Sequence, residues 1–250
     1  MKLTNVTEKD EISAQLLGLT DQHIHYFEQK NTQDIKPLTN SKALGIHAQM
    51  LADFQALVTS AARAKIEIKI ASGFRSFERQ LLIWNNKFTG KTIIKDAAGE
   101  QIQITQLSNY EIVKSIMLYT ALPGASRHHW GCDIDIYAAN LLNGQALQLE
   151  PWEYEEFGPM AKLSTWLTEN ASKFRFYLPY DSFRGGVAKE PWHLSYAPLA
   201  KQYQSAFSLK ALRQCLIKTD IAGKEAIIEN LAEIFKRYIS NVNTNNPLIK

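Results

Sequence analysis

The chain has 250 residues, 45% of them hydrophobic, which is enough for one large domain or for one domain with a helical addition. Its formal net charge is +3, and the Lys and Arg residues are scattered rather than gathered in a basic stripe, which argues against nucleic acid as a partner. Its two cysteines, Cys132 and Cys215, are too few for a disulfide framework, so we expect buried free thiols.

Charged residues interrupt the first eleven positions, where a secretory signal needs an unbroken apolar core. We therefore expect no Sec-type signal and a cytoplasmic location, while action in the periplasm or at the cell wall by another route stays open. Elsewhere no apolar run approaches the roughly 20 residues that a transmembrane helix needs. The sequence does not indicate an oligomeric state.

The first predicted elements are a helix and a strand. Residues 41–64 carry apolar side chains at steps of three and four, with Ser41 available as a cap, which predicts an amphipathic helix. Residues 65–70 alternate strictly between charged and apolar, a pattern typical of a β-strand with one buried face. Gly73 is then expected to end the strand.

Two capped helices are predicted next. Residues 76–88 place apolar side chains on one face and begin with a serine, so Arg75 is expected on the turn between strand and helix. Turn residues within 89–107 indicate an excursion from the core. Ser108 and Glu111 then form the pattern of a capping box, which predicts the start of another helix.

The second half of the chain combines short strands with helices. Apolar and acidic residues alternate around Asp133 and Asp135, which predicts a strand whose two aspartates share one face. A helix is expected after Gly158, followed by short strands at 174–177 and 193–196. The remaining chain is predicted to be helical nearly to its end. Helices around a small sheet define the α+β class.

Two segments far apart in the chain carry the residues of a split zinc site. A catalytic zinc takes three protein ligands, keeps one position for water, and accepts imidazole nitrogen and carboxylate oxygen. His128, Asp135 and His193 supply this set, because His128 precedes the strand that carries Asp135 and His193 begins a strand that can lie beside it. We therefore expect one Zn²⁺ in a cleft on the sheet.

Two further residues fit the chemistry of a metallohydrolase. Glu190 stands three residues before His193 and is expected to act as general base and to return the proton to the leaving amine. The guanidinium of Arg75 suits a tetrahedral oxyanion or a substrate carboxylate. Gln80, in the helix that follows, offers a neutral hydrogen bond.

Other polar residues near these segments have simpler interpretations. Asp133 is expected either on the solvated face of an edge strand or hydrogen-bonded to a ligand histidine. We expect His129 to point away from the metal. His23 and His25 share one face if their stretch is extended, but no third ligand stands near them in sequence, so a packing or surface role is preferred. His47 is expected to be structural.

Taken in order, these residues resemble the M15 group of zinc peptidases, and within it the D-alanyl-D-alanine carboxypeptidases similar to VanY. The resemblance covers about residues 65–200. It rests on three blocks: Ser72-Gly73-Phe74-Arg75-Ser76 with Gln80; Ser126, His128, Gly131 and Asp135; and Glu190, Trp192 and His193. Asp133 departs from it, because many relatives have a small residue two positions before the aspartate ligand.

The resemblance implies a fold and a set of roles. The fold is a small antiparallel sheet with helices packed around it, in a single domain over 1–250 that adds an N-terminal helical segment, 1–64, and C-terminal helices, 201–242. The implied roles are zinc ligands for His128, Asp135 and His193, catalytic base for Glu190, transition-state or substrate contact for Arg75, and pocket lining for Gln80 and Ser126.

The function implied is that of a zinc carboxypeptidase that removes terminal D-Ala from a peptidoglycan stem peptide or muropeptide. Two alternatives stay open: an endopeptidase of the same family, and a non-catalytic, zinc-stabilised module that binds cell-wall peptides. A structural zinc takes four protein ligands, so the module would need Asp133 or His129 to complete the set. Retention of Glu190 favours an enzyme, and D,D- versus L,D-specificity is not readable.

Overall fold

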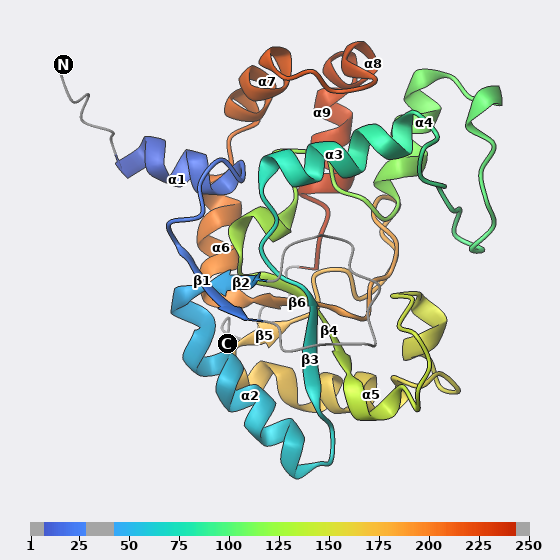
Figure 1. Cartoon of the computed structure of the whole chain (residues 1–250). Coiled ribbons are helices and arrows are strands. Elements are labelled where there is room, and N and C mark those ends of the chain that lie inside the picture. The colour runs from blue at the N-terminus through green and yellow to red at the C-terminus, as the bar shows by residue number, and fades with distance from the viewer. Residues whose placement is uncertain (1–7, 29–42, 244–250) are drawn as a thin grey trace.

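Two antiparallel sheets organise the chain in the computed structural model, which describes residues 8–28 and 43–243 (Figure 1). The first sheet pairs β1 with β2, and the second has four strands in the order β3-β4-β6-β5. The strands are β1 (Ile24–Glu28), β2 (Ala43–His47), β3 (Ile68–Ser72), β4 (Asp133–Ala138), β5 (Phe176–Tyr177) and β6 (His193–Tyr196). This confirms the predicted α+β class with a small antiparallel sheet.

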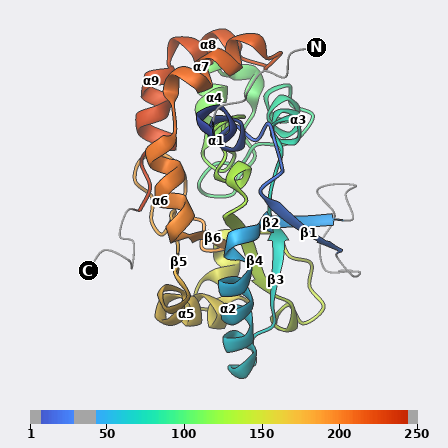
Figure 2. The ribbon, with the colours of Figure 1, turned by 90° about the vertical axis from the view of Figure 1, so that its left-hand side faces the viewer.

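The helices gather at the two ends of the four-stranded sheet. Figures 1 and 2 show α3, α4, α7, α8 and α9 above it and α2 and α5 below it. Their bounds are α1 (Glu8–Leu16), α2 (Leu51–Arg63), α3 (Phe77–Phe88), α4 (Asn109–Met117), α5 (Ala161–Asn170), α6 (Ala197–Ala206), α7 (Leu209–Lys218), α8 (Lys224–Glu229) and α9 (Leu231–Ile234). No helix in the described ranges is both long and apolar enough to span a bilayer.

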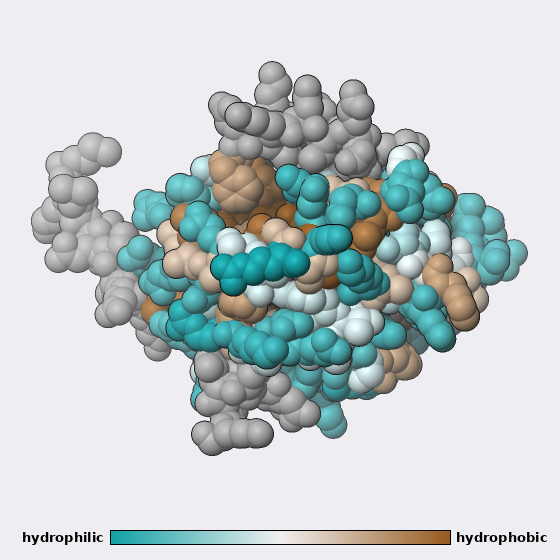
Figure 3. Space-filling view, turned by 90° about the horizontal axis from the view of Figure 1, so that it is seen from below, coloured by the Kyte–Doolittle hydropathy of each residue, from teal (hydrophilic) through white to brown (hydrophobic). Residues whose placement is uncertain are grey.

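Buried side chains form two hydrophobic clusters that follow this arrangement. One cluster joins the sheets to α2 and α5, and the other joins α3, α4 and the C-terminal helices. The view from below shows many hydrophilic side chains with hydrophobic ones between them (Figure 3), while α2 and α5 turn buried apolar residues toward the sheet. A cavity of about 680 Å³ is lined by residues of both clusters, so it lies where the sheet meets the upper helices.

Local sequence signals predicted several of these elements. The helix expected over 76–88 is α3, and the Ser76 side chain accepts a hydrogen bond from the backbone N–H of Arg79. The capping box of Ser108 and Glu111 starts α4, with both reciprocal hydrogen bonds present. The cysteines are free thiols as expected, although only Cys132 is fully buried.

The helix predicted over 41–64 is wrong in its first part. Residues 43–47 form β2, a 3₁₀ turn follows, and α2 begins only at Leu51. Gly45 pairs with β1 so closely that an added Cβ would lie 2.4 Å from a side-chain atom of Ile24. Pairing with a strand elsewhere in the chain thus overrides the apolar spacing, and the segment before residue 65 is not purely helical. Ser41, the expected cap, lies outside the described residues.

Candidate metal centre

Strand pairing brings the three predicted ligands together. Asp135 of β4 faces His193 of β6 across the antiparallel pair, and His128 lies in the 3₁₀ turn Arg127–Trp130 just before β4. One potential ligand atom from each residue lies within 4.8 Å of the others, and all three side chains are buried. Within the described residues, this is the group of His, Cys, Asp and Glu side chains that has the geometry for a metal ion.

Each histidine nitrogen lies about as far from an oxygen of Asp135 as two ligand atoms of a tetrahedral zinc lie from each other. Ligand atoms at tetrahedral corners about 2.0–2.1 Å from the metal stand about 3.3 Å apart. The distance from His128 Nε2 to Asp135 Oδ2 is 3.4 Å, and that from His193 Nδ1 to Asp135 Oδ1 is 3.3 Å. Asp135 Oδ1 is also buried without a hydrogen-bond partner, which is the environment expected of an atom that binds a cation.

Each candidate histidine is oriented by its other ring nitrogen. Nδ1 of His128 lies 3.1 Å from the carbonyl oxygen of Gly73, and Nε2 of His193 lies 3.1 Å from Asp133 Oδ1. Because these partners are acceptors, the facing nitrogens carry protons, and His128 Nε2 and His193 Nδ1 are the ring atoms turned toward Asp135 that a metal could bind.

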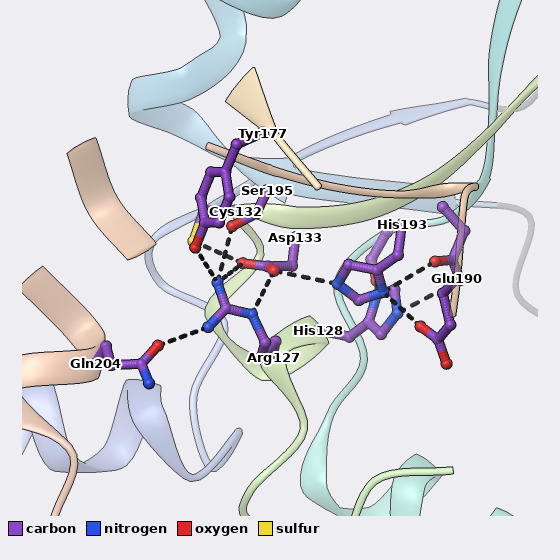
Figure 4. Close-up of polar contacts among 11 residues, drawn as sticks. Arg127, His128, Cys132, Asp133, Tyr177, Glu190, His193, Ser195 and Gln204 are labelled. Carbon is purple, nitrogen blue, oxygen red and sulfur yellow. Dashed lines mark hydrogen bonds and ion pairs between the residues drawn. The ribbon is translucent and has the colours of Figure 1, made fainter. Parts of the chain in front are cut away.

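Behind His193, Asp133 belongs to a closed polar network (Figure 4). Arg127 Nε donates to Asp133 Oδ1 at 2.7 Å, and the same guanidinium donates to the side chains of Ser195, Tyr177 and Gln204 at 2.9, 3.0 and 2.9 Å. Burial alone would raise the pKa of Asp133, but the charge of Arg127 and the hydrogen bond with His193 lower it to about 2.

The positions of Asp133 and His129 distinguish between the interpretations that the sequence left open for them. The edge-strand interpretation of Asp133 is wrong, because β4 lies between β3 and β6 and this side chain is fully buried; the hydrogen bond to His193 is confirmed. His129 points away from the site as predicted, with Nδ1 2.6 Å from the carbonyl oxygen of Arg75 and Nε2 accepting from the N–H of Gly124. Neither residue completes a four-ligand set.

Glu190 lies beside the ligand group and faces the cavity. Its Oε2 is 3.3 Å from His193 Nδ1, and the side chain is buried and lines the cavity. The turn that holds it is fixed by two backbone hydrogen bonds, from Glu190 N–H to the Tyr180 carbonyl and from His193 N–H to the Glu190 carbonyl. Burial raises the pKa of Glu190, with the hydrogen bond to His193 opposing this effect.

Of the remaining predicted residues, two line the cavity and one lies behind its wall. Arg75 and Ser126 line the cavity, and the buried Ser126 hydroxyl lacks a hydrogen-bond partner. Gln80, expected in the pocket wall, instead lies fully buried behind Arg75, because its amide accepts from Arg75 Nη1 at 2.9 Å and donates to the Ala121 carbonyl at 2.6 Å. Arg75 Nη2 donates to Ser72 Oγ at 3.0 Å.

Sequence reasoning missed Arg127 and Tyr180. The ring of Tyr180 meets that of His193 edge-on at 5.0 Å and lines the cavity. For Arg127 a signal was present: Asp133 shares a strand face with Asp135, and Ser195 shares one with His193, so the two polar residues face each other in the pair. A buried carboxylate beside a buried hydroxyl needs a hydrogen-bond donor nearby, because unpaired polar groups are unfavourable in the core.

Comparison with known proteins identifies the family. A family model described as VanY, D-alanyl-D-alanine carboxypeptidase, matches residues 43–199. Two proteins of Haemophilus influenzae, both named only as uncharacterized, are 45% identical over 121 residues, covering 47% of this chain and 92% of theirs, and 40% identical over 86 residues, covering 34% and 59%. A protein of Bacillus subtilis that carries the name "Putative carboxypeptidase YodJ" is 30% identical over 135 residues, or 52% of this chain and 38% of its own length.

Solved structures with a similar arrangement include VanYB in complex with D-alanine-D-alanine, at 21% identity and a TM-score of 0.46 over 74% of this chain and 91% of that one. The LD-carboxypeptidase LdcB has 19% identity and a TM-score of 0.46, over 82% of this chain and 77% of its own. The family match covers more than half of the chain, and the protein therefore belongs to the VanY family of D-alanyl-D-alanine carboxypeptidases, within the M15 peptidases.

Proposed function

We propose that the protein is a zinc-dependent carboxypeptidase that removes the terminal D-alanine from peptidoglycan stem peptides. One observation carries the proposal: His128, Asp135 and His193 converge at the wall of a large cavity, with the unused carboxylate of Glu190 beside them. A purely structural zinc would be enclosed by four protein ligands and would need no such neighbour.

The donor set and its spacing fit zinc, and these three residues would hold one ion. When bound, zinc supplies Lewis acidity that polarises a carbonyl and lowers the pKa of water to about 7. The protein supplies the orientation, because hydrogen bonds to Gly73 and Asp133 fix both imidazole rings before any ligand arrives.

Glu190 is the proposed general base. Its carboxylate stands on the cavity side of His193, where it can accept a proton from an attacking water and deliver it to the amine that leaves. Burial raises its pKa above the ordinary value of a glutamate, which makes the carboxylate a stronger proton acceptor.

Arg75 is the proposed contact for the free carboxylate at the end of the substrate. Ser72 and Gln80 orient its guanidinium through neutral acceptors, so its positive charge is left for an incoming group. A planar guanidinium forms two parallel hydrogen bonds to a carboxylate, which distinguishes a free C-terminus from an internal amide.

The test uses two peptides that both contain D-Ala-D-Ala, one with a free C-terminus and one amidated. We expect zinc-loaded protein to release D-alanine from the free peptide only, and chelation of zinc to abolish the release. Cleavage of both peptides at similar rates would favour the endopeptidase alternative. Absence of cleavage in protein shown to contain zinc would favour the non-catalytic module.

A further inference from the structure

One wall of the cavity is formed by a face of α3 that carries two cationic side chains, Arg79 and Lys87. Arg79, Ile83 and Lys87 follow at intervals of four residues along α3, and all three line the cavity. Arg75, on the turn that leads into α3, extends the same wall toward the metal centre. The wall therefore presents three positively charged side chains to the cavity, those of Arg75, Arg79 and Lys87.

The other charged side chains of the cavity already have partners. Lys95 Nζ pairs with Glu150 Oε1 at 2.6 Å, and Arg127 pairs with Asp133 on the far side of His193. Asp135 and Glu190 belong to the metal centre. Glu190 and Glu150 act on Lys87 from a distance, but no acidic group of the cavity forms an ion pair with the cations of this wall.

The three cations have neutral partners or none. Lys87 Nζ donates to Thr120 Oγ1 at 2.7 Å, and Nε of Arg79 is buried without a hydrogen-bond partner. Across residues 8–28 and 43–243, no carboxylate forms an ion pair with Arg75, Arg79 or Lys87. An ammonium has three donors, so Lys87 keeps two for another group.

Keeping Lys87 charged at this position is unfavourable without an anion. Burial lowers the pKa of Lys87 and the nearby charge of Arg75 lowers it further, while the more distant charges of Glu190 and Glu150 only partly oppose this effect. A cation that is partly removed from water and placed beside like charges is stabilised when an anion enters. One C-terminal carboxylate, held by Arg75, would leave Arg79 and Lys87 without an ion pair.

We propose that Lys87, together with Arg79, forms a subsite for a second carboxylate of the substrate, carried on a side chain rather than at the C-terminus. This inference rests on the proposed carboxypeptidase function and narrows its substrate class to acidic peptides. Lys87 is a specificity residue in this scheme, since it binds a group remote from the bond that is cleaved. Its hydrogen bond to Thr120 holds the ammonium in place.

The experiment compares two peptides with free C-termini that differ only in one side chain, a carboxylate in the first and its amide in the second. We expect the zinc-loaded protein to have a higher kcat/KM for the acidic peptide by about 10-fold, the lower end for a hydrogen bond to a charged group. Lys87→Gln should remove this preference by raising KM for the acidic peptide, and Lys87→Arg should restore part of it.

Lys91→Gln is the matched control, because it removes the same charge from an exposed side chain that does not line the cavity. It should leave the preference intact. Equal kcat/KM for the two peptides in the parent protein, or an equal loss for both peptides in Lys87→Gln, would overturn the subsite. If neither peptide is cleaved, the proposed function fails, and the ratio of their dissociation constants by calorimetry still decides the subsite.

Discussion

Two pairs of buried histidines lie in the described part of the chain, and they differ in what surrounds them. The rings of His128 and His193 are 4.9 Å apart, and those of His23 and His47 are 5.3 Å apart. The first pair contacts carboxylates on both sides of His193. In the second pair, His47 Nε2 lies 3.0 Å from the hydroxyl of Tyr203 and Nδ1 accepts from a backbone N–H.

The surroundings give the two pairs opposite proton affinities. Burial lowers the pKa of His47 to about 4, and it lowers that of His23 despite opposing contributions that include Asp21. Burial would also lower the pKa of His193, but the surrounding carboxylates of Asp133, Asp135 and Glu190 raise it well above its ordinary value. Ring spacing alone therefore does not make a metal site. The candidate site also has carboxylates that can compensate a dication, and Asp135 is among them as the third potential ligand.

The largest effect is expected from removing a ligand of the first pair. His193→Ala should lose zinc, and peptide hydrolysis should fall to background, because two remaining ligands hold the ion poorly. His47→Ala, in the second pair, is the control and should keep full zinc content. Metal analysis of the purified variants measures both. Full zinc in His193→Ala would exclude it as a ligand.

The next largest effect separates catalysis from metal binding. Glu190→Gln keeps the shape of the side chain but cannot accept a proton, so we expect kcat to fall by about 10²–10⁴ with zinc retained. The control is the parent protein treated with a chelator, in which activity and zinc content should fall together. Turnover at the parent rate would remove Glu190 from the mechanism.

A smaller effect, on zinc affinity, is expected from changing Asp133, which hydrogen-bonds to His193. Asp133→Asn removes the charge that faces Arg127 and weakens the hydrogen bond that orients His193, and changes of this kind typically reduce metal affinity by about 10–100-fold. Competition with a chelator measures the affinity, and the melting temperature reports any general loss of fold. An unchanged zinc affinity would show that Asp133 serves only to balance the charge of Arg127.

Much of this centre was predictable because its signals are local or follow strand periodicity. A serine cap and a capping box fix the starts of α3 and α4 within a few residues of sequence. The alternation around Asp135 put Asp133 on the same strand face, and the pairing of β4 with β6 then brought both near His193. The residue types that zinc accepts then predicted which side chains form the candidate ligand group.

The errors arose where distant segments decide the structure. Strand β2 forms because β1 is available as a partner, and no spacing within residues 43–50 reveals this. Gln80 lies behind Arg75 because α3 packs on the segment after α4, where the Ala121 carbonyl accepts from its amide. Arg127 binds side chains from four elements, β4, β5, β6 and α6, which a single motif does not show.

The smallest effect is expected from the second histidine pair. It concerns the stability of the fold in acid and not the metal centre. The folded-state pKa of His47 is about 4 and the unfolded value is 6.5, so the unfolded chain binds more protons between these limits and stability falls as the pH drops from 6.5. This one group contributes a loss of up to about 3 kcal/mol by pH 4. His47→Asn keeps an acceptor for the N–H of Gln49 but no longer titrates, so its stability deficit relative to the parent should shrink between pH 7 and pH 5. Denaturant unfolding of both zinc-loaded proteins measures the deficit, and a constant deficit across that range would show that His47 is not held neutral by burial.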